Sequence, residues 1–263
     1  MTSIELTGRT GHIPTSQTRD ARPPARRLIA VELRKMTDTR AGFWLAVCIA
    51  LISLAFAIIA SASHGGHQAT LGHVLKVSIT PAALLLPVMG VLLICGEWSQ
   101  RTTLTTFTLV PNRWRVIRAK ATASVIVATV ALGACVALTF ACVHLFGHAD
   151  GGPGSLSATL VGQCWLYLAL QMVMGLGFGA AILVSAPAIV TYLLLPTIWD
   201  TVVSGFHVLA GLAHWLAPSQ ALGALTEGSM NGTAWAQALV TSLVWIGIPL
   251  AIGLTRIGRG DIA

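Results

Sequence analysis

Long uncharged apolar runs alternate with short polar stretches from residue 42 to the end of the chain. A helix that crosses a bilayer needs about 20 predominantly apolar residues. Six runs have this length, and a short turn near Pro187 separates the fourth from the fifth. The pattern predicts an all-α integral membrane protein with six transmembrane helices, over residues 42–62, 77–95, 121–146, 160–183, 187–206 and 234–255.

Two further segments do not fit a membrane span. Between the fifth and sixth runs, residues 207–233 contain the apolar stretch GLAHWLAP, which is too short to cross. We expect a short re-entrant or interfacial helical segment there, on the external side. Residues 1–22 have little apolar content, and we expect a disordered cytoplasmic leader.

Residues 23–41 carry helical periodicity before the first span. Ile29, Leu33 and Met36 are spaced i, i+4 and i+7, and Arg34 lies away from this stripe. We expect an amphipathic helix that lies in the headgroup layer. A simple anchor that sets the orientation of the chain and an anchor that also contacts a cytoplasmic partner are both consistent with this pattern.

Composition and charge support a membrane protein and indicate the orientation of the chain across the membrane. The chain is 55% hydrophobic and 10% charged, whereas soluble domains have about 25% charged residues. Eight Lys and Arg residues precede residue 42, five lie in 96–120, two follow residue 255, and only Lys76 lies on the other side. The positive-inside rule therefore places both termini and residues 96–120 in the cytoplasm. The net charge of +7 is thus explained by orientation, and we expect no nucleic-acid partner.

The cysteines and the ratio of Arg to Lys indicate where the protein is located but point to no reactive or metal-binding site. All five cysteines lie in apolar runs without a CxxC pair, and we expect no disulfide framework and no metal site. Arg greatly outnumbers Lys, and Ala, Val and Gly are abundant, which indicates a GC-rich genome. We expect a multi-pass protein of the plasma (inner) membrane of a bacterium.

The loop 96–120 has the features of a docking segment. Glu97 and Arg101 are four residues apart and can pair on a helix, but the charges and hydroxyls that follow prevent a lipid-facing continuation. Leu104 and Phe107 supply a small apolar face, and Pro111 ends that helix or sets its turn. An ordinary cytoplasmic loop that follows the charge rule is the alternative interpretation.

Several short patterns occur together in a fixed order along the chain. An apolar span ends in Gly-Glu-Trp, then Arg-Thr-Thr-Leu follows, and Pro111 comes before Arg113. A Glu-Leu-Arg-Lys helix precedes the first span, the fourth span is Gly-rich, Leu-Ala-Pro follows the fifth, and Arg-Gly-Asp-Ile closes the chain. Over residues 25–263 this order resembles the permease subunits of ABC transporters of the type-2 exporter family.

The resemblance implies an architecture and a set of partners. Such permeases form dimers of six-span halves, from two identical or two related chains, and two cytoplasmic ATPase subunits that bind ATP and Mg lie beneath them. Closure of the ATPases passes to the spans through a coupling helix in the first cytoplasmic loop and through the elbow helix. By resemblance, the coupling residues are Glu97, Arg101, Thr102, Leu104, Phe107, Pro111 and Arg113, and the elbow residues are Glu32, Arg34 and Lys35.

The chain is not expected to be an enzyme or to bind a cofactor itself. A P-loop ends in Gly-Lys-Ser or Gly-Lys-Thr, and no Gly-Lys dipeptide occurs here. The glycine run of the fourth span lies inside an apolar helix with no strand before it. Gly175 and Gly179 instead form a GxxxG pair suited to close helix packing.

Polar residues inside the spans are candidates for a substrate path. Asp200, next to Trp199, is an acid within the fifth span, and such acids usually face a bundle interior or an aqueous cavity. It could line the path, or it could cap the helical segment that follows. Gln163 and Gln171 of the fourth span could face the same cavity or bond neighbouring helices.

The resemblance thus favours an ATP-driven exporter permease, and the apolar spans with few charges suit a hydrophobic or amphipathic compound. An ion-coupled secondary transporter that uses Asp200 is the alternative, although such proteins usually show internal repeats and several buried ionisable residues. A membrane protease would need motifs such as HExxH, which does not occur in the chain.

Overall fold

The computed structural model describes residues 24–62, 70–99, 113–146, 156–206, 210–228 and 230–259. Every regular element within these ranges is a helix, as the sequence predicts. Six of these helical segments are long and apolar enough to cross a membrane, which confirms the six predicted runs. They cover Arg40–Ala62, Leu71–Gly96, Trp114–Phe146, Ala158–Ile182, Ser185–Gly205 and Gly232–Arg256. The predicted leader 1–22 lies outside the described residues.

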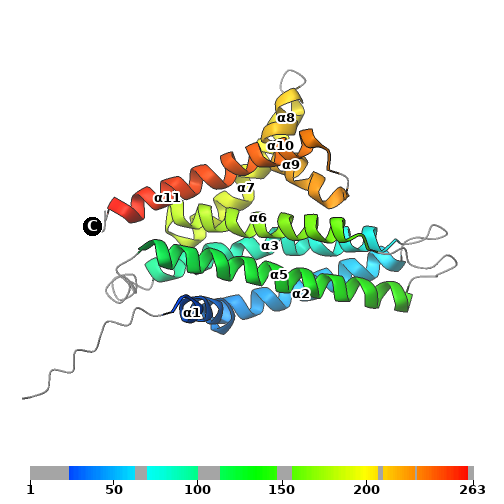
Figure 1. Ribbon diagram of the computed structural model, residues 1–263, viewed down its shortest axis with the longest axis horizontal. Coiled ribbons are helices and arrows are strands. Elements are labelled where there is room, and N and C mark those ends of the chain that lie inside the picture. The colour runs from blue at the N-terminus through cyan, green and yellow to red at the C-terminus, as the bar shows by residue number, and fades with distance from the viewer. Residues whose placement is uncertain are drawn as a thin grey trace, which may run out of the picture.

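Four long helices form the main bundle, and they run side by side in Figure 1. They are α2 (Arg40–Ala62), α3 (Leu71–Ser99), α5 (Arg113–Phe146) and α6 (Ala158–Ile182). The most apolar windows of α3 and α6 are 72% and 56% buried, against 22% for α2. The core of the protein therefore lies along the contact between α3 and α6, and α3 continues as one helix through Pro81 and Pro87.

Small residues allow α3 and α6 to approach closely. A Cβ atom added to Gly175 would collide with the backbone of Pro87, and one added to Gly179 would lie 3.1 Å from the Val91 Cα atom. A glycine of α3 makes the same kind of contact with α6, because a Cβ on Gly90 would lie 3.0 Å from the Met172 carbonyl oxygen. Both residues of the predicted GxxxG pair thus lie on the face of α6 that meets α3.

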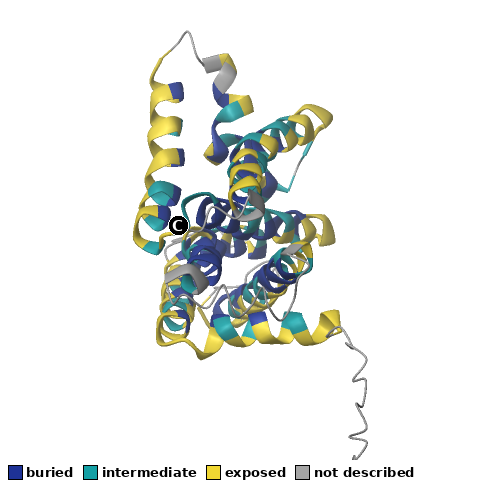
Figure 2. Cartoon of the chain, turned by 90° about the vertical axis from the view of Figure 1, so that its left-hand side faces the viewer, coloured by how far each residue is buried: buried dark blue, intermediate teal, exposed yellow. Residues whose placement is uncertain are grey.

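The helix α1 (Ala25–Asp38) lies across one end of this bundle. It is seen end-on in Figure 1, and Figure 2 shows it from the side, with an exposed outer surface and buried positions toward the bundle. Met36 is 4% exposed, and Ile29 and Leu33 pack against the same core. The periodic stripe in the sequence thus becomes the face by which α1 contacts the other helices.

The corner between α1 and α2 is set by two residues. The Thr39 hydroxyl accepts a hydrogen bond from the Gly42 backbone N–H at 3.1 Å, which caps the start of α2. A Cβ on Gly42 would collide with the Met36 carbonyl oxygen. The chain can therefore turn sharply from α1 into the first span.

The remaining helices meet above the bundle in Figure 1, and the last of them returns to pack against α6. The α6–α7 turn is made by Leu183, which has a positive φ of 64° and donates its N–H to the Gly179 carbonyl. The segment predicted between the fifth and sixth spans contains two short helices and a 3₁₀ turn, and a π-helical turn interrupts the sixth span. In chain order these elements are α7 (Ser185–Gly205), α8 (Ala210–Leu216), α9 (Pro218–Gly223), η2 (Ala224–Glu227), α10 (Gly232–Ser242), η3 (Leu243–Gly247) and α11 (Ile248–Arg259).

Two glycines of α6 should respond oppositely to the same substitution. We expect Gly175→Ala to destabilise the protein by about 1–3 kcal/mol, because the added methyl overpacks the contact with Pro87. Gly162→Ala, whose Cβ would meet nothing within 4 Å, should be neutral or stabilising by up to about 1 kcal/mol through helix propensity. Thermal unfolding of the purified full chain measures both, and equal effects would contradict the packing role.

Candidate functional site

A buried ion cluster lies at the end of the bundle that carries α1. Lys120 of α5 donates to Glu32 of α1, with 2.7 Å between Nζ and Oε2. The other carboxylate oxygen of Glu32 accepts from Lys35 at 2.9 Å, and Lys120 also donates to the Leu93 carbonyl of α3 at 3.2 Å. Glu32 and Lys120 are each 4% exposed. Two of the predicted elbow residues, Glu32 and Lys35, thus belong to a cluster that joins three helices.

The positions of these charges follow from helical geometry. Glu32 lies three residues after Ile29 and four before Met36, so it shares the apolar face that α1 turns toward the bundle. Lys120 lies two turns inside α5, where Ala119 and Ala123 are also buried. Burying one of these ions alone would cost several kcal/mol. In the cluster each carboxylate oxygen meets an ammonium group.

The cluster also fixes the two ends of the segment predicted to carry coupling. The helix α3 ends at Ser99 and α5 begins at Arg113, so Leu93 and Lys120 flank that segment on either side. Because Lys120 bonds both Leu93 and Glu32, displacement of any of α1, α3 and α5 is resisted by the other two. The cluster therefore links the middle of α1 to positions about two turns inside α3 and α5.

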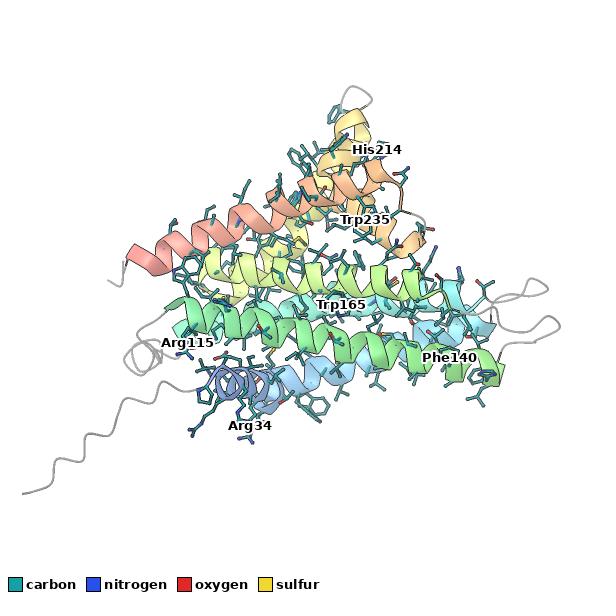
Figure 3. All side chains as sticks on the ribbon, in the orientation of Figure 1. Arg34, Arg115, Phe140, Trp165, His214 and Trp235 are labelled. Carbon is teal, nitrogen blue, oxygen red and sulfur yellow. The ribbon has the colours of Figure 1, made fainter. Side chains whose placement is uncertain are left out.

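The predicted coupling residues themselves fall mostly outside the described part of the chain. This holds for Arg101, Thr102, Leu104, Phe107 and Pro111, and for the side chains of Glu97 and Arg113, which lie in the last turn of α3 and at the start of α5. The pairing of Glu97 with Arg101 stays a prediction. Arg34, the third predicted elbow residue, is exposed on α1, and Figure 3 shows it on the side turned away from the bundle.

Asp200 has a specific partner in the structure. Its Oδ2 atom accepts the backbone N–H of Ser219 at 3.2 Å, and Ser219 is the second residue of α9. An acid at this place satisfies an N–H that the helix leaves unbonded and interacts favourably with the helix dipole. Of the two roles open from the sequence, the observed contact is the capping one.

The same corner is held from its other side by the sixth span. Thr241 donates its hydroxyl to the Trp215 carbonyl at 2.6 Å, and the Trp245 indole N–H donates to the Leu216 carbonyl at 2.9 Å. These are carbonyls at the end of α8, where a helix leaves acceptors free. Sequence reasoning missed this role, although a buried indole N–H within an apolar span signals the need for a partner.

The other candidates for the substrate path have separate surroundings. Gln171 donates to the Tyr167 hydroxyl at 3.3 Å within α6. Gln163 is 7% exposed, and its Oε1 atom has no hydrogen-bond partner in the described part of the chain. Trp199 stacks edge-to-face with Trp245 at 6.4 Å between ring centroids. No hydrogen bond among the described residues joins either glutamine to Asp200.

An apolar groove of about 640 Å³ lies between α6 and the sixth span. The Ser242 hydroxyl at its wall donates to the Ala238 carbonyl, so the lining presents little free polar surface. Trp235, in the first turn of α10, is one of the lining residues and is labelled in Figure 3. The groove suits apolar groups, and its side chains include Leu166, Leu170, Val173, Leu239, Leu243 and Ile246.

Neither comparison with known proteins identifies a relative. A scan against models of protein families found no match, and a search of curated proteins found none. Within the described ranges, no group of three or more His, Cys, Asp or Glu side chains lies close enough to hold a metal ion. Functional conclusions therefore rest on the residues and their contacts.

The ion cluster gives a direct stability test. We expect Glu32→Gln to destabilise the full chain by about 3–5 kcal/mol, because it removes the buried carboxylate that pairs with the buried Lys120 ammonium. Adding Lys120→Met to this variant should recover part of the loss, which a double-mutant cycle detects. Glu227→Gln is the matched control, because its pair with Lys76 is exposed and should contribute about 0–1 kcal/mol. Equal losses for Glu32→Gln and Glu227→Gln in thermal unfolding would refute the burial argument.

Two replacements of Asp200 separate the capping role from a role in transport. Asp200→Asn keeps an oxygen acceptor for the Ser219 N–H, whereas Asp200→Ala removes it. We expect Asp200→Ala to cost about 0.5–2 kcal/mol of stability and Asp200→Asn clearly less. Thermal unfolding gives both values. Loss of transport by Asp200→Asn at unchanged stability would instead place the acid in the substrate path.

Proposed function

We propose that this chain is the transmembrane permease subunit of an ATP-driven exporter of the ABC type. It would work with a second permease subunit, identical or related, and with two copies of a cytoplasmic ATPase subunit that binds ATP and Mg. The observation that carries the proposal is the buried cluster of Glu32, Lys120 and Leu93. It supports a transmission element at the place where the sequence pattern expects one.

The argument is mechanical. An ATPase that moves beneath a membrane domain must transmit its displacement through elements stiff enough not to absorb it. The link from Lys120 to both Glu32 and Leu93 ties α1 to the helices on either side of residues 100–112. A push on the elbow or on the loop would therefore move α3 and α5 together. Since α3 packs closely against α6, the displacement would continue into the core of the bundle.

The dimeric assembly is supported by uneven burial. The most apolar window of α7 is only 17% buried, and that of α2 22%. Such faces contact lipid or another apolar helix. A second permease subunit that packs on either of them would enclose a path between the two halves.

Orientation and cargo complete the proposal. By the positive-inside rule, the end that carries α1 and the last turn of α11 would face the cytoplasm. The Arg-rich composition supports the plasma membrane of a bacterium. A hydrophobic or amphipathic cargo is supported by apolar spans with few charges. The ion-coupled alternative would need a carboxylate oxygen that is available to an ion. Asp200 Oδ2 accepts the Ser219 N–H, but Oδ1 is buried and has no hydrogen-bond partner among the described residues, so this alternative is decided by experiment.

The deciding experiment identifies the motor. We expect cross-linking of the full chain in its native membrane, followed by gentle extraction, to recover a soluble protein with a Gly-x-x-x-x-Gly-Lys-Ser/Thr motif. Charge reversal by Arg101→Glu, within the expected docking segment, should abolish its recovery and the stimulation of ATP turnover by cargo. Arg259→Glu, which makes the same charge change near the C-terminus, should preserve both.

Each outcome bears on the proposal. Recovery of the ATPase by the unaltered chain and by Arg259→Glu, but not by Arg101→Glu, supports coupling through the loop. Failure to recover any such ATPase removes the main support for an ABC permease and makes the ion-coupled alternative the leading hypothesis. Membrane insertion, followed by fluorescence of a fused reporter, controls for simple loss of the protein.

A further inference from the structure

A small groove lies between the first two turns of α1 and the start of α5. Its volume is about 240 Å³, and it lies on a different face of α5 from Lys120. On the α1 side the wall is apolar, with Ala25, Leu28 and Ile29. On the α5 side Ala119 continues this apolar surface, and the polar groups are those of Arg115, Arg118 and Thr122. The groove thus combines an apolar floor with a cationic wall.

Among the described residues that line the groove, the charged side chains are both arginines. Arg115 and Arg118 are three residues apart on α5 and therefore project from the same face. Arg26 and Arg27 add cations in the first turn of α1, which contains no acid. Among the described acids of α1, Glu32 is bonded to two lysines, and Asp38 is at the far end, about 20 Å along the helix axis. The described charges at the groove therefore favour an anion over a cation.

Aromatic residues place the groove at the level of the lipid headgroups. Trp114 precedes Arg115 on α5 and is 61% exposed, and Trp44 in the second turn of α2 is 63% exposed. Tryptophans gather at the membrane–water boundary, where their rings contact both apolar and polar groups. Figure 3 shows Arg115 at the same end of the bundle as α1. An occupant of the groove would have its polar part at the headgroup level and its apolar part toward the bilayer core.

We propose that this groove binds one anionic phospholipid of the cytoplasmic leaflet. The guanidinium groups of Arg115 and Arg118 would hold the phosphate, which arginine binds with parallel hydrogen bonds. An acyl chain would lie against Leu28, Ile29 and Ala119. Basic pockets between helices on the cytoplasmic side suit such headgroups. A soluble anion has no apolar part that would contact the apolar floor of the groove. The bound lipid would bridge α1 and α5, the same helices that Glu32 and Lys120 join.

This inference rests on the proposed orientation and not on coupling to an ATPase. Its failure would leave the ATPase experiment unaffected, and failure to find an ATPase would leave the lipid site standing.

Native mass spectrometry of the full chain in detergent tests the site with defined lipids. We expect one phosphatidylglycerol to be retained per chain more tightly than phosphatidylcholine. Arg115→Gln with Arg118→Gln should weaken phosphatidylglycerol binding about 10- to 30-fold, because each arginine near the surface contributes roughly one factor of five. Arg34→Gln with Arg40→Gln removes the same charge from exposed positions at the same end outside the groove, and should leave binding unchanged.

The controls make the result decisive. Arg118 is exposed, so Arg118→Gln alone should fold normally and weaken phosphatidylglycerol binding about 5-fold. This single variant replaces the double variant in the test if the double variant is unstable. Equal weakening by the Arg34 and Arg40 pair would indicate general surface attraction and overturn the proposal. Unchanged binding in the Arg115 and Arg118 variants would also overturn it. Displacement of phosphatidylglycerol by inorganic phosphate would assign the groove to a soluble anion instead.

Discussion

The structure depends on one constraint, which is that a charged group buried among apolar helices is very costly unless the protein supplies a partner for it. The buried ammonium of Lys120 meets Glu32 and the Leu93 carbonyl. At the opposite end of the spans, Asp200 and Trp245 bond the backbone on either side of the corner between α8 and α9. These contacts decide which helices are tied together, because a bonded pair in an apolar medium is costly to break.

Between these two polar regions the protein is held by close packing. Hydrophobic burial gives little preference for protein over lipid, so helices associate where small residues let their backbones approach. Gly175 and Gly179 of α6 and Gly90 of α3 make such a contact. The sixth span joins from the other side, where a Cβ on Gly253 would collide with Ala180. By contrast, α7 buries little of its surface within the chain. The molecule therefore has a rigid central pair of helices and an apolar face that is open to lipid or to a second subunit.

The contrast between closely packed helices and little-buried helix faces suggests how the proposed permease would move. The ion cluster joins α1 to both sides of the loop that we expect an ATPase to contact, and the glycine contact carries movement from α3 into α6. The corner beyond α7 is held to both α7 and the sixth span, so those two spans would move with it. A lipid in the groove beside Arg115 would add a further link between α1 and α5. Transport would then require relative movement of stiff groups of helices, with the least buried faces as the places where they slide.

The sequence by itself determined the helical class, the six spans, the short segment between the last two and the apolar stripe of α1, because hydrophobic periodicity and length are local properties. It also marked Gly175 and Gly179 by their spacing. Only the tertiary structure decided that Glu32 pairs with Lys120, 88 residues away, and that Asp200 caps α9 across 19 residues. A local pattern indicates that a charge on an apolar helix face needs a partner, but which residue becomes that partner depends on which helices pack together. That choice depends on the packing of the whole bundle and is written in no single segment.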